Sequence, residues 1–471
     1  MIGRMVRVSG ALAMLALAGC AQFSADGGMA TVSGSVKQET GKDVAKLASA
    51  AETQRARAEI DALVQAPLDV EAAVQIALLN NRGLQAAFNE LGISEAAYVQ
   101  ASLPPNPGIS LSRLAGGGVV EVEFRLIGNL LALATLPQRS EIAARQFEQA
   151  KYRAVEATLR LAVDTRRAWF RAVAASQRAA LLEQSRAAAD AATRTMIQLG
   201  ESGAANTLDQ SRLAAFYAEL SAQLAQARLR ARGDREALTR FMGLWGGGLW
   251  GGDLDYRLPP QLPALPAEPE TRSNVEIEAV RRRVDLVIAR QEVATLAKSF
   301  KLDEATRYVS LLQLAGIYNG ETTNNDVGTF DNVQRLGLDL DVSIPIFDSG
   351  EARLRGARET YMRAVNRLAE RSVNARSEAR SAYDAYRSTW DIARFYQSRV
   401  LPLRRTISNE VLLRYNGMLV DVFELLIDAR ERIAASSASL EALRDFYLAT
   451  ADLQAALIVG DPTHNDKGER P

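Results

Sequence analysis

The composition of this 471-residue chain excludes several classes of function. Fifty-six basic residues balance 56 acidic ones, so the formal net charge is zero and the usual electrostatic basis for nucleic-acid binding is absent. With one histidine (His464) and one cysteine (Cys20), a subunit cannot build a Cys/His metal cluster, a disulfide or a Cys/His nucleophile pair. No pair of acidic residues stands out from the helical charge background. We therefore expect a non-enzyme that holds no metal and no cofactor.

The first 19 residues are typical of an export signal. Two arginines precede an apolar run over residues 8–18, and small residues then lead directly to Cys20, a pattern that marks a removable signal peptide. The end of the run resembles the bacterial lipobox, which implies that the Cys20 sulfur receives a diacylglyceryl group and that Cys20 becomes the new N-terminus. Ala21 follows, and the resemblance then implies sorting to the outer membrane, where acyl chains such as palmitate anchor the protein in lipid.

Residues 20–67 are rich in small and charged residues and show no sustained apolar stripe. This composition predicts a lipidated leader, a connecting segment between the anchor and the folded body. Residues 68–103 then carry apolar side chains spaced by three and four, which predicts helix. Three prolines within residues 104–107 end this helix and turn the chain into extended structure.

Alternating apolar and polar residues predict two strands in the first half, at residues 109–114 and 120–128, joined by a glycine-rich turn. On the second strand, Glu121 and Glu123 fall on one face and Val122 falls on the other. A soluble sheet with one solvated face shows the same alternation, so each strand alone is weak support for a membrane barrel.

The second half repeats the pattern at residues 309–318 and 336–347, with a polar loop predicted between the two strands. Here Asp339 and Asp341 oppose Leu338. The mature chain offers no run of about 18 apolar residues, so any membrane crossing must use strands.

The acidic residues of these strands define a candidate lumen. A charge on the lipid face of a barrel costs about 2–4 kcal/mol near the midplane. We therefore predict that Glu121, Glu123, Asp339 and Asp341 face water inside a channel.

Each half continues into a helical hairpin, with first arms predicted at about residues 138–199 and 348–414. A helix of about 60 residues would be about 90 Å long, which indicates an elongated assembly. One offset aligns both arms and places Gly203 on Gly417, so the two turn regions coincide and the architecture is duplicated. Pro402 should kink the second-half helix or open a local turn.

The duplication divides the chain into a first repeat (68–243), a connector (244–272), a second repeat (273–459) and a polar tail (460–471). Around the connector Gly-Leu-Trp-Gly-Gly occurs twice, and five prolines follow. No Walker lysine or strand-loop-helix context accompanies these glycines, so we interpret the connector as turn-rich rather than as a phosphate site.

The predicted fold is mainly α with a small β part. Four strands per chain leave two exposed edges, whose N–H and C=O groups lipid cannot satisfy. Closing a barrel therefore needs further copies, and three chains would supply twelve strands with room for a channel. The long hairpins mix Ala, Leu and charged residues at helical spacing, as expected of helices packed as coiled coils.

Within this frame, several motifs between residues 68 and 459 resemble the TolC family of outer-membrane channel proteins. They are Asn-Arg-Gly-Leu at 81–84, Arg-Val-Asp-Leu at 283–286, and the segments 103–107, 343–350, 415–417 and 420–426. The family implies a homotrimer in which a twelve-stranded β-barrel stands on a long periplasmic α-helical barrel. Two features depart from the family: Leu136-Pro137 replaces a Pro-x-Phe-x-x-Gly pattern, and the interval from Gly417 to Asp421 is short.

The resemblance implies an outer-membrane exit channel of a tripartite efflux system, a passive conduit whose partners are a periplasmic adaptor protein and an inner-membrane pump. Two alternatives stay open. The exit duct of a type I protein secretion system uses the same fold, and a lipid-anchored periplasmic coiled-coil scaffold would carry similar helices. The exported substrate is not specified by the sequence.

A periplasmic gate is predicted at the second hairpin tip. Asp421, Glu424 and Asp428 are spaced by three and four beyond the turn, so they share a helix face and would form carboxylate rings in a trimer. The family resemblance matches the first two to acidic tip positions, and Arg414 and Tyr415 would then hold the closed tip by hydrogen bonds between hairpins. A solvated face paired with neighbouring arginines is the alternative.

Overall fold

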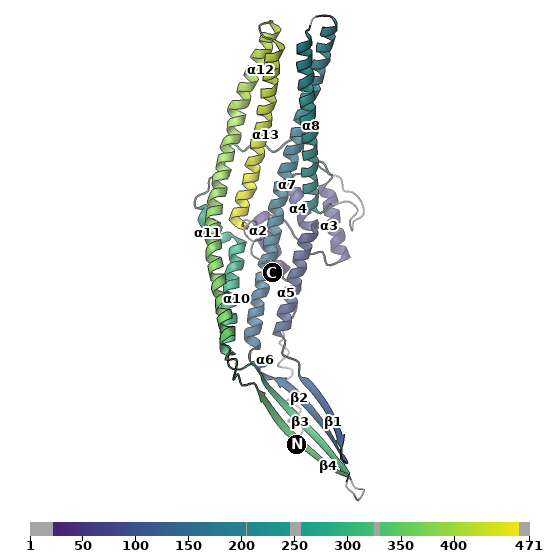
Figure 1. The fold of residues 1–471 in the computed structure, drawn as a ribbon, viewed down its shortest axis with the longest axis vertical. Coiled ribbons are helices and arrows are strands. Elements are labelled where there is room, and N and C mark those ends of the chain that lie inside the picture. Colours follow the sequence, from purple (N-terminus) through teal and green to yellow (C-terminus); the bar gives the residue numbers. More distant parts are fainter. Residues whose placement is uncertain (1–21, 204, 245–255, 325–329, 461–471) are drawn as a thin grey trace. The chain divides into compact units, whose positions relative to one another are not determined.

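The computed structural model describes residues 22–203, 205–244, 256–324 and 330–460. Contacts divide the chain into two compact units, and most of their elements are labelled in Figure 1. The strand unit draws on residues up to 30, 89–153 and 286–371, and the hairpin unit on the remainder. Each unit takes segments from both predicted repeats, so neither unit corresponds to one repeat. Among the described residues, no helix has an apolar stretch long enough to cross a bilayer.

The strand unit contains one antiparallel sheet in the order β1-β2-β3-β4. The strands are β1 (Gly108–Gly116), β2 (Val119–Asn129), β3 (Leu312–Asn324) and β4 (Phe330–Val342). Gly117 and Gly118 take φ values of 60° and 81° between β1 and β2. Two consecutive positive φ angles suit the tight two-residue hairpin turn that the glycine-rich segment predicts.

The second pair of strands is longer and placed differently from our expectation. The segment predicted as a polar loop is mostly paired strand, because β3 continues to Asn324 and β4 begins at Phe330. Antiparallel pairing is made by the backbone, so polar side chains can sustain it, and here Thr322 and Asn332 also share a side-chain hydrogen bond of 2.7 Å. The predicted strand ending at residue 347 instead stops at Val342.

Helical segments complete the strand unit. They belong to α5 (Arg82–Ser102), α6 (Leu130–Ala134), α7 (Leu136–Glu201), α10 (Val284–Ala305) and α11 (Glu351–Phe395). Asn129 ends β2 and caps α6, because its side-chain oxygen accepts the backbone N–H of Ala132 at 2.8 Å. Strand and helix therefore follow one another without a loop.

The hairpin unit contains the two long helical hairpins together with shorter helices. Its further elements are α2 (Met29–Thr40), α3 (Ala50–Leu63), α4 (Val70–Asn80), α8 (Thr207–Met242), α9 (Val275–Arg282), α12 (Leu401–Asn416) and α13 (Val422–Ile458). Its larger core cluster surrounds Trp169, whose ring nitrogen donates to the Leu68 carbonyl at 2.8 Å. Phe170 stacks on Tyr447 with ring centroids 4.7 Å apart, which joins α7 to α13.

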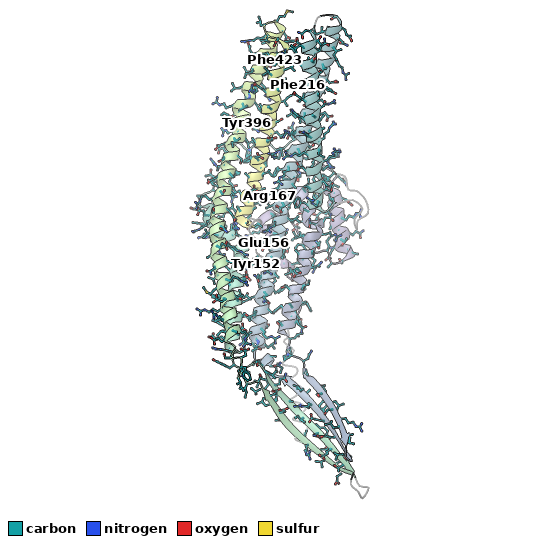
Figure 2. The ribbon with its side chains drawn as sticks, viewed as in Figure 1. Tyr152, Glu156, Arg167, Phe216, Tyr396 and Phe423 are labelled. Carbon is teal, nitrogen blue, oxygen red and sulfur yellow. The ribbon has the colours of Figure 1, made fainter. Side chains whose placement is uncertain are left out.

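Pro402 opens a local turn, as the sequence predicts. Tyr396–Val400 forms one π-helical turn directly before α12, and Tyr396 is labelled in Figure 2. Pro402 has no N–H to donate, and its ring crowds the carbonyl of Ser398, so the preceding turn widens.

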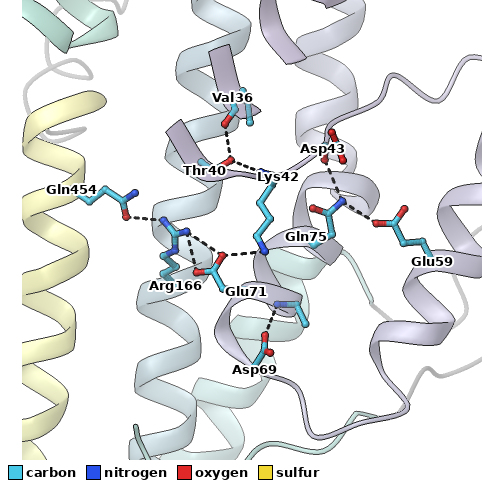
Figure 3. A network of polar contacts seen from close by, with 11 residues as sticks. Val36, Thr40, Lys42, Asp43, Glu59, Asp69, Glu71, Gln75, Arg166 and Gln454 are labelled. Atoms are coloured by element: carbon cyan, nitrogen blue, oxygen red, sulfur yellow. Dashed lines mark hydrogen bonds and ion pairs between the residues drawn. The ribbon is translucent and has the colours of Figure 1, made fainter. Parts of the chain in front are cut away.

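The leader is folded, contrary to our expectation of a connecting segment. Its α2 and α3 pack in the hairpin unit, where Val32 and Val36 are fully buried. Lys42 lies 3.1 Å from Glu71, which also accepts from Arg166 at 3.1 Å (Figure 3). Composition missed this segment because it has few apolar positions, such as Val32 and Val36, and its polar partners lie far away in the sequence.

The earlier part of the leader docks on the strand unit. Glu95 is buried and accepts both the backbone N–H of Ser24 at 2.7 Å and its hydroxyl at 2.5 Å. Asp26 accepts the backbone N–H of Ala30, which is the main cause of a lowered pKa for its carboxyl.

The motifs Asn-Arg-Gly-Leu at 81–84 and Arg-Val-Asp-Leu at 283–286, which resemble the TolC family, lie at two helix breaks. The helix expected over residues 68–103 is broken at Asn81, between α4 and α5, and Arg283 likewise separates α9 from α10. In the first break, Asn81 donates to the Phe241 carbonyl at 2.9 Å, and Asn80 donates to the Gly243 carbonyl at 2.7 Å. Arg283 is 3% exposed and pairs with Asp285 at 2.7 Å. These breaks are therefore made by long-range hydrogen bonds and a buried ion pair rather than by low helix propensity.

Gly243 provides a test of the first break. It ends α8 with φ 66°, and an added Cβ would lie 2.8 Å from the Asn80 carbonyl oxygen. Gly243→Ala should lower the free energy of unfolding by about 2 kcal/mol or more, because the left-handed conformation costs about 1–2 kcal/mol and the contact adds to it.

Gly233→Ala is the matched control. Gly233 lies inside α8 and a Cβ there would meet nothing within 4 Å, so alanine should stabilise the helix by about 0.5–1 kcal/mol. Thermal denaturation shows whether each variant melts below or above the wild type. Equal melting temperatures for the two variants would contradict the role given to Gly243 at the helix break.

Candidate functional site

The sheet has one charged face. Strand register places Glu123 opposite Asn319, and Glu121 opposite Glu321 on β3. Arg125 forms an ion pair with Asp339 of β4, and Asn319 donates to Glu121. We call this surface the polar face; its charged side chains include Glu121, Glu123, Arg125, Glu321, Arg335, Asp339 and Asp341. Three strands from both halves of the chain thus build one continuous polar surface.

The opposite face of the sheet is mainly apolar and uncovered, although Arg113 of β1, which lies opposite Val122, also belongs to it. We call it the apolar face; it consists of Ile109, Leu111, Val122, Phe124, Leu126, Leu314, Tyr318, Leu336, Leu338, Leu340 and Val342. Leu336 is 87% exposed and Leu338 is 82% exposed. A water-soluble protein rarely exposes so many large apolar side chains together. This face therefore requires an apolar surrounding.

Both outer edges of the sheet are open within the described chain. The order β1-β2-β3-β4 leaves one side of β1 and one side of β4 without a strand partner among the described residues. Unpaired N–H and C=O groups along an edge template the addition of another strand. The sheet is thus suited to joining further copies edge to edge.

The sequence-predicted lumen residues share one face in the structure. Glu121, Glu123 and Asp339 join the hydrogen-bond and ion-pair network, and Asp341 lies on the same face opposite Gln313. Sequence reasoning missed Glu321 and Arg335, which pair at 3.1 Å, because Glu321 was assigned to a loop and the following strand was predicted to begin only at residue 336. Their alternation with Gly320 and Leu336 is the signal that could have identified them.

The second hairpin tip carries the sequence-predicted gate residues. Asp421 caps α13 by accepting the backbone N–H of Glu424 at 3.1 Å, and both side chains are exposed. Arg414 pairs with Glu410 at 3.0 Å on its own helix, and among the described residues it forms no ion pair with the other hairpin. Tyr415 supplies its carbonyl to the Met418 N–H at 3.0 Å, which closes the turn.

Asp428 does not share the exposed surface of Asp421 and Glu424. It is 8% exposed, and its Oδ1 has no hydrogen-bond partner among the described residues. The alternative of pairing with Arg430 is not observed, because Arg430 pairs with Glu219 of α8 at 3.0 Å.

The two hairpins meet near their tips through aromatic residues. Arg212 of α8 lies 4.9 Å from the ring centre of Phe423 on α13, and Arg430 lies 5.5 Å from that of Phe216 (both rings are labelled in Figure 2). Each contact is a cation–π interaction, which is worth about 0.5–1 kcal/mol where exposed. The predicted lipidation site Cys20, the predicted signal peptide and most of the predicted polar tail with His464 lie outside the described residues.

Comparisons with known proteins identify the fold. No protein family and no curated relative matches the sequence. Among solved structures, the CmeC outer membrane channel of Campylobacter jejuni is 15% identical, with 84% of this chain and 87% of that chain covered and a TM-score of 0.69. The open MtrE outer membrane channel of Neisseria gonorrhoeae is 18% identical, with 83% and 89% covered and a TM-score of 0.67. CusC, a transmembrane channel, is 16% identical, with 83% of this chain and 92% of that chain covered and a TM-score of 0.67.

These likenesses confirm the expected fold class. The chain has the fold of TolC-like outer-membrane channels: long helices with one four-stranded antiparallel sheet per chain.

Proposed function

We propose that this chain is one subunit of an outer-membrane exit channel in a tripartite efflux system. The observation that carries the proposal is the sheet, which combines a charged face, an uncovered apolar face and two open edges. In lipid, every backbone polar group needs a protein partner, so an open sheet with a lipid-facing surface must close with other copies. A homotrimer supplies twelve strands, and the polar face then lines water.

The remaining parts of the proposal rest on the fold. Channels of this type act as passive conduits, and this one would join a periplasmic adaptor protein and an inner-membrane pump while a gate at the hairpin tips controls passage. The charged side chains on the sheet have neighbours of opposite sign, such as Arg125 with Asp339, which supports a hydrated wall rather than a catalytic site. A soluble lipid-anchored scaffold is disfavoured because it leaves the apolar face in water.

Thiol labelling in membranes tests the proposal. Cysteine at Glu121 or Asp339 should react with a water-soluble maleimide, whereas cysteine at Val122 or Leu340 should react poorly. Wild type serves as the parent, because a lipidated Cys20 has no free thiol. Purified wild type should also conduct ions in planar bilayers; equal labelling of both faces together with absence of conductance would contradict a channel.

Lipidation at Cys20 is a separate prediction. Cys20→Ser should abolish incorporation of radioactive palmitate while leaving the melting temperature unchanged, since Cys20 is the only cysteine and no disulfide is lost. The docked residue Ser24 follows four positions later and should keep the leader in place. Label retained on Cys20→Ser would refute lipidation at this residue.

A further inference from the structure

A cavity of about 190 Å³ in the hairpin unit has no role in the proposed conduit. It lies between α7, α8 and α13, far along the chain from both hairpin tips. Ala174, Ala175, Leu440 and Leu448 supply its apolar lining, and arginine and acidic side chains supply the rest.

The helix pattern explains the hollow. Arg171, Ala174, Ala175 and Arg178 are spaced by three, four and seven, so they occupy one face of α7. The two alanines are too short to fill the space between the helices, and the arginines on the adjacent turns reach around it. The result is a small apolar floor beside guanidinium groups.

The charges of the cavity are not balanced. Arg178 pairs with Glu441, and Arg444 lies 2.7 Å from Asp445. The third acidic lining residue, Asp234, forms no ion pair among the described residues, although Arg230 is only one turn away.

Two lining arginines are left with unused donors. Arg171 and Arg230 have neither an ion pair nor a side-chain hydrogen bond among the described residues, and each guanidinium offers five N–H donors. The lining as a whole therefore carries one positive charge in excess, located at these two residues.

We infer that this cavity binds an oxyanion group, a carboxylate or a phosphate, with Arg171 and Arg230 as its ligands. A planar guanidinium donates two parallel hydrogen bonds to such a group, and the opposite charges make these bonds stronger than those to a neutral acceptor. The volume holds several water molecules and hence one such group, and the alanine and leucine floor accommodates a short aliphatic stem. The oxyanion comes either from a free small anion or from an acidic side chain of a second copy of this chain.

The first test uses inorganic phosphate. Calorimetric titration of the purified full-length protein, with chloride at matched ionic strength, should detect binding in wild type. R171Q/R230Q should bind at least about tenfold more weakly, because hydrogen bonds to charged groups contribute about 1.5–3 kcal/mol each. R194Q/R232Q is the control, since it removes two exposed arginines from the same helices outside the cavity.

The second test identifies an occupant from a second copy. If an acidic side chain of a second copy fills the cavity, the assembled wild type does not bind phosphate. Light scattering should then show that R171Q/R230Q dissociates at about tenfold higher protein concentration than wild type. R194Q/R232Q should dissociate at the same concentration as wild type. The inference is overturned if R171Q/R230Q changes neither phosphate binding nor assembly, or if both variants change them equally. Conductance of the same variants in bilayers reports separately on the channel, so a failure of one proposal is distinguishable from a failure of the other.

Discussion

Leu338→Arg should prevent stable insertion of the assembled protein into the outer membrane. Leu338 is 82% exposed in the middle of the apolar face. An arginine facing lipid near the midplane costs about 2–4 kcal/mol, which shifts an equilibrium by about 30-fold to 1,000-fold, and every copy in a trimer carries the change. Membrane fractionation followed by electrophoresis without heating should show the loss of the trimer band.

Ile317→Arg is the matched control for the strand faces. Ile317 pairs with Gly337, the residue beside Leu338, so the two sites lie at nearly the same level of the sheet. Ile317 belongs to the polar face, where Arg125 and Asp339 also lie. Arginine there should remain hydrated and leave the amount of trimer nearly unchanged. If both variants assemble equally well, the apolar face does not meet lipid.

The second large effect is expected at the hairpin tip. Asp421→Asn combined with Glu424→Gln should reduce the preference of the channel for cations several-fold and weaken its block by multivalent cations, because carboxylate rings at a constriction attract cations. Both side chains are exposed at the start of α13, as such a role requires. Single-channel recording in planar bilayers with a salt gradient measures the selectivity.

The helix cap at Asp421 must be separated from its charge. Asparagine caps a helix as well as aspartate does, whereas alanine loses the bond to the Glu424 N–H and about 0.5–2 kcal/mol of stability. Asp421→Asn should therefore alter selectivity without lowering the melting temperature, and Asp421→Ala should do both. Arg414→Ala with Tyr415→Phe should raise conductance if these residues hold the tip closed. Unchanged selectivity in the Asn/Gln variant would locate the constriction elsewhere.

Local patterns were sufficient for much of the fold. The alternation around Glu121, Val122 and Glu123 assigns each side chain to a face, because a strand has a period of two whatever surrounds it. Helical spacing predicted the long arms, and Pro402 predicted the altered turn before α12, since proline acts on its own backbone. The cap at Asp421 could also have been predicted, because Glu424 follows at the third position.

Contacts between distant residues decided what local patterns could not. The helix breaks at Asn81 and Arg283 involve distant partners, the Phe241 carbonyl and Glu378, which no propensity reveals. The cavity at Arg171 and Arg230 exists because three helices converge there.

By itself the sequence determined the strand faces and the long helical hairpins, because these follow from periodicity. Lipidation at Cys20 stays a prediction from a short local signal. Only the tertiary structure decided that the leader is folded, that Arg125 meets Asp339 and that Asp428 is buried, because each depends on which segments the fold brings together. Local geometry is encoded residue by residue, whereas pairing across the chain is set by packing.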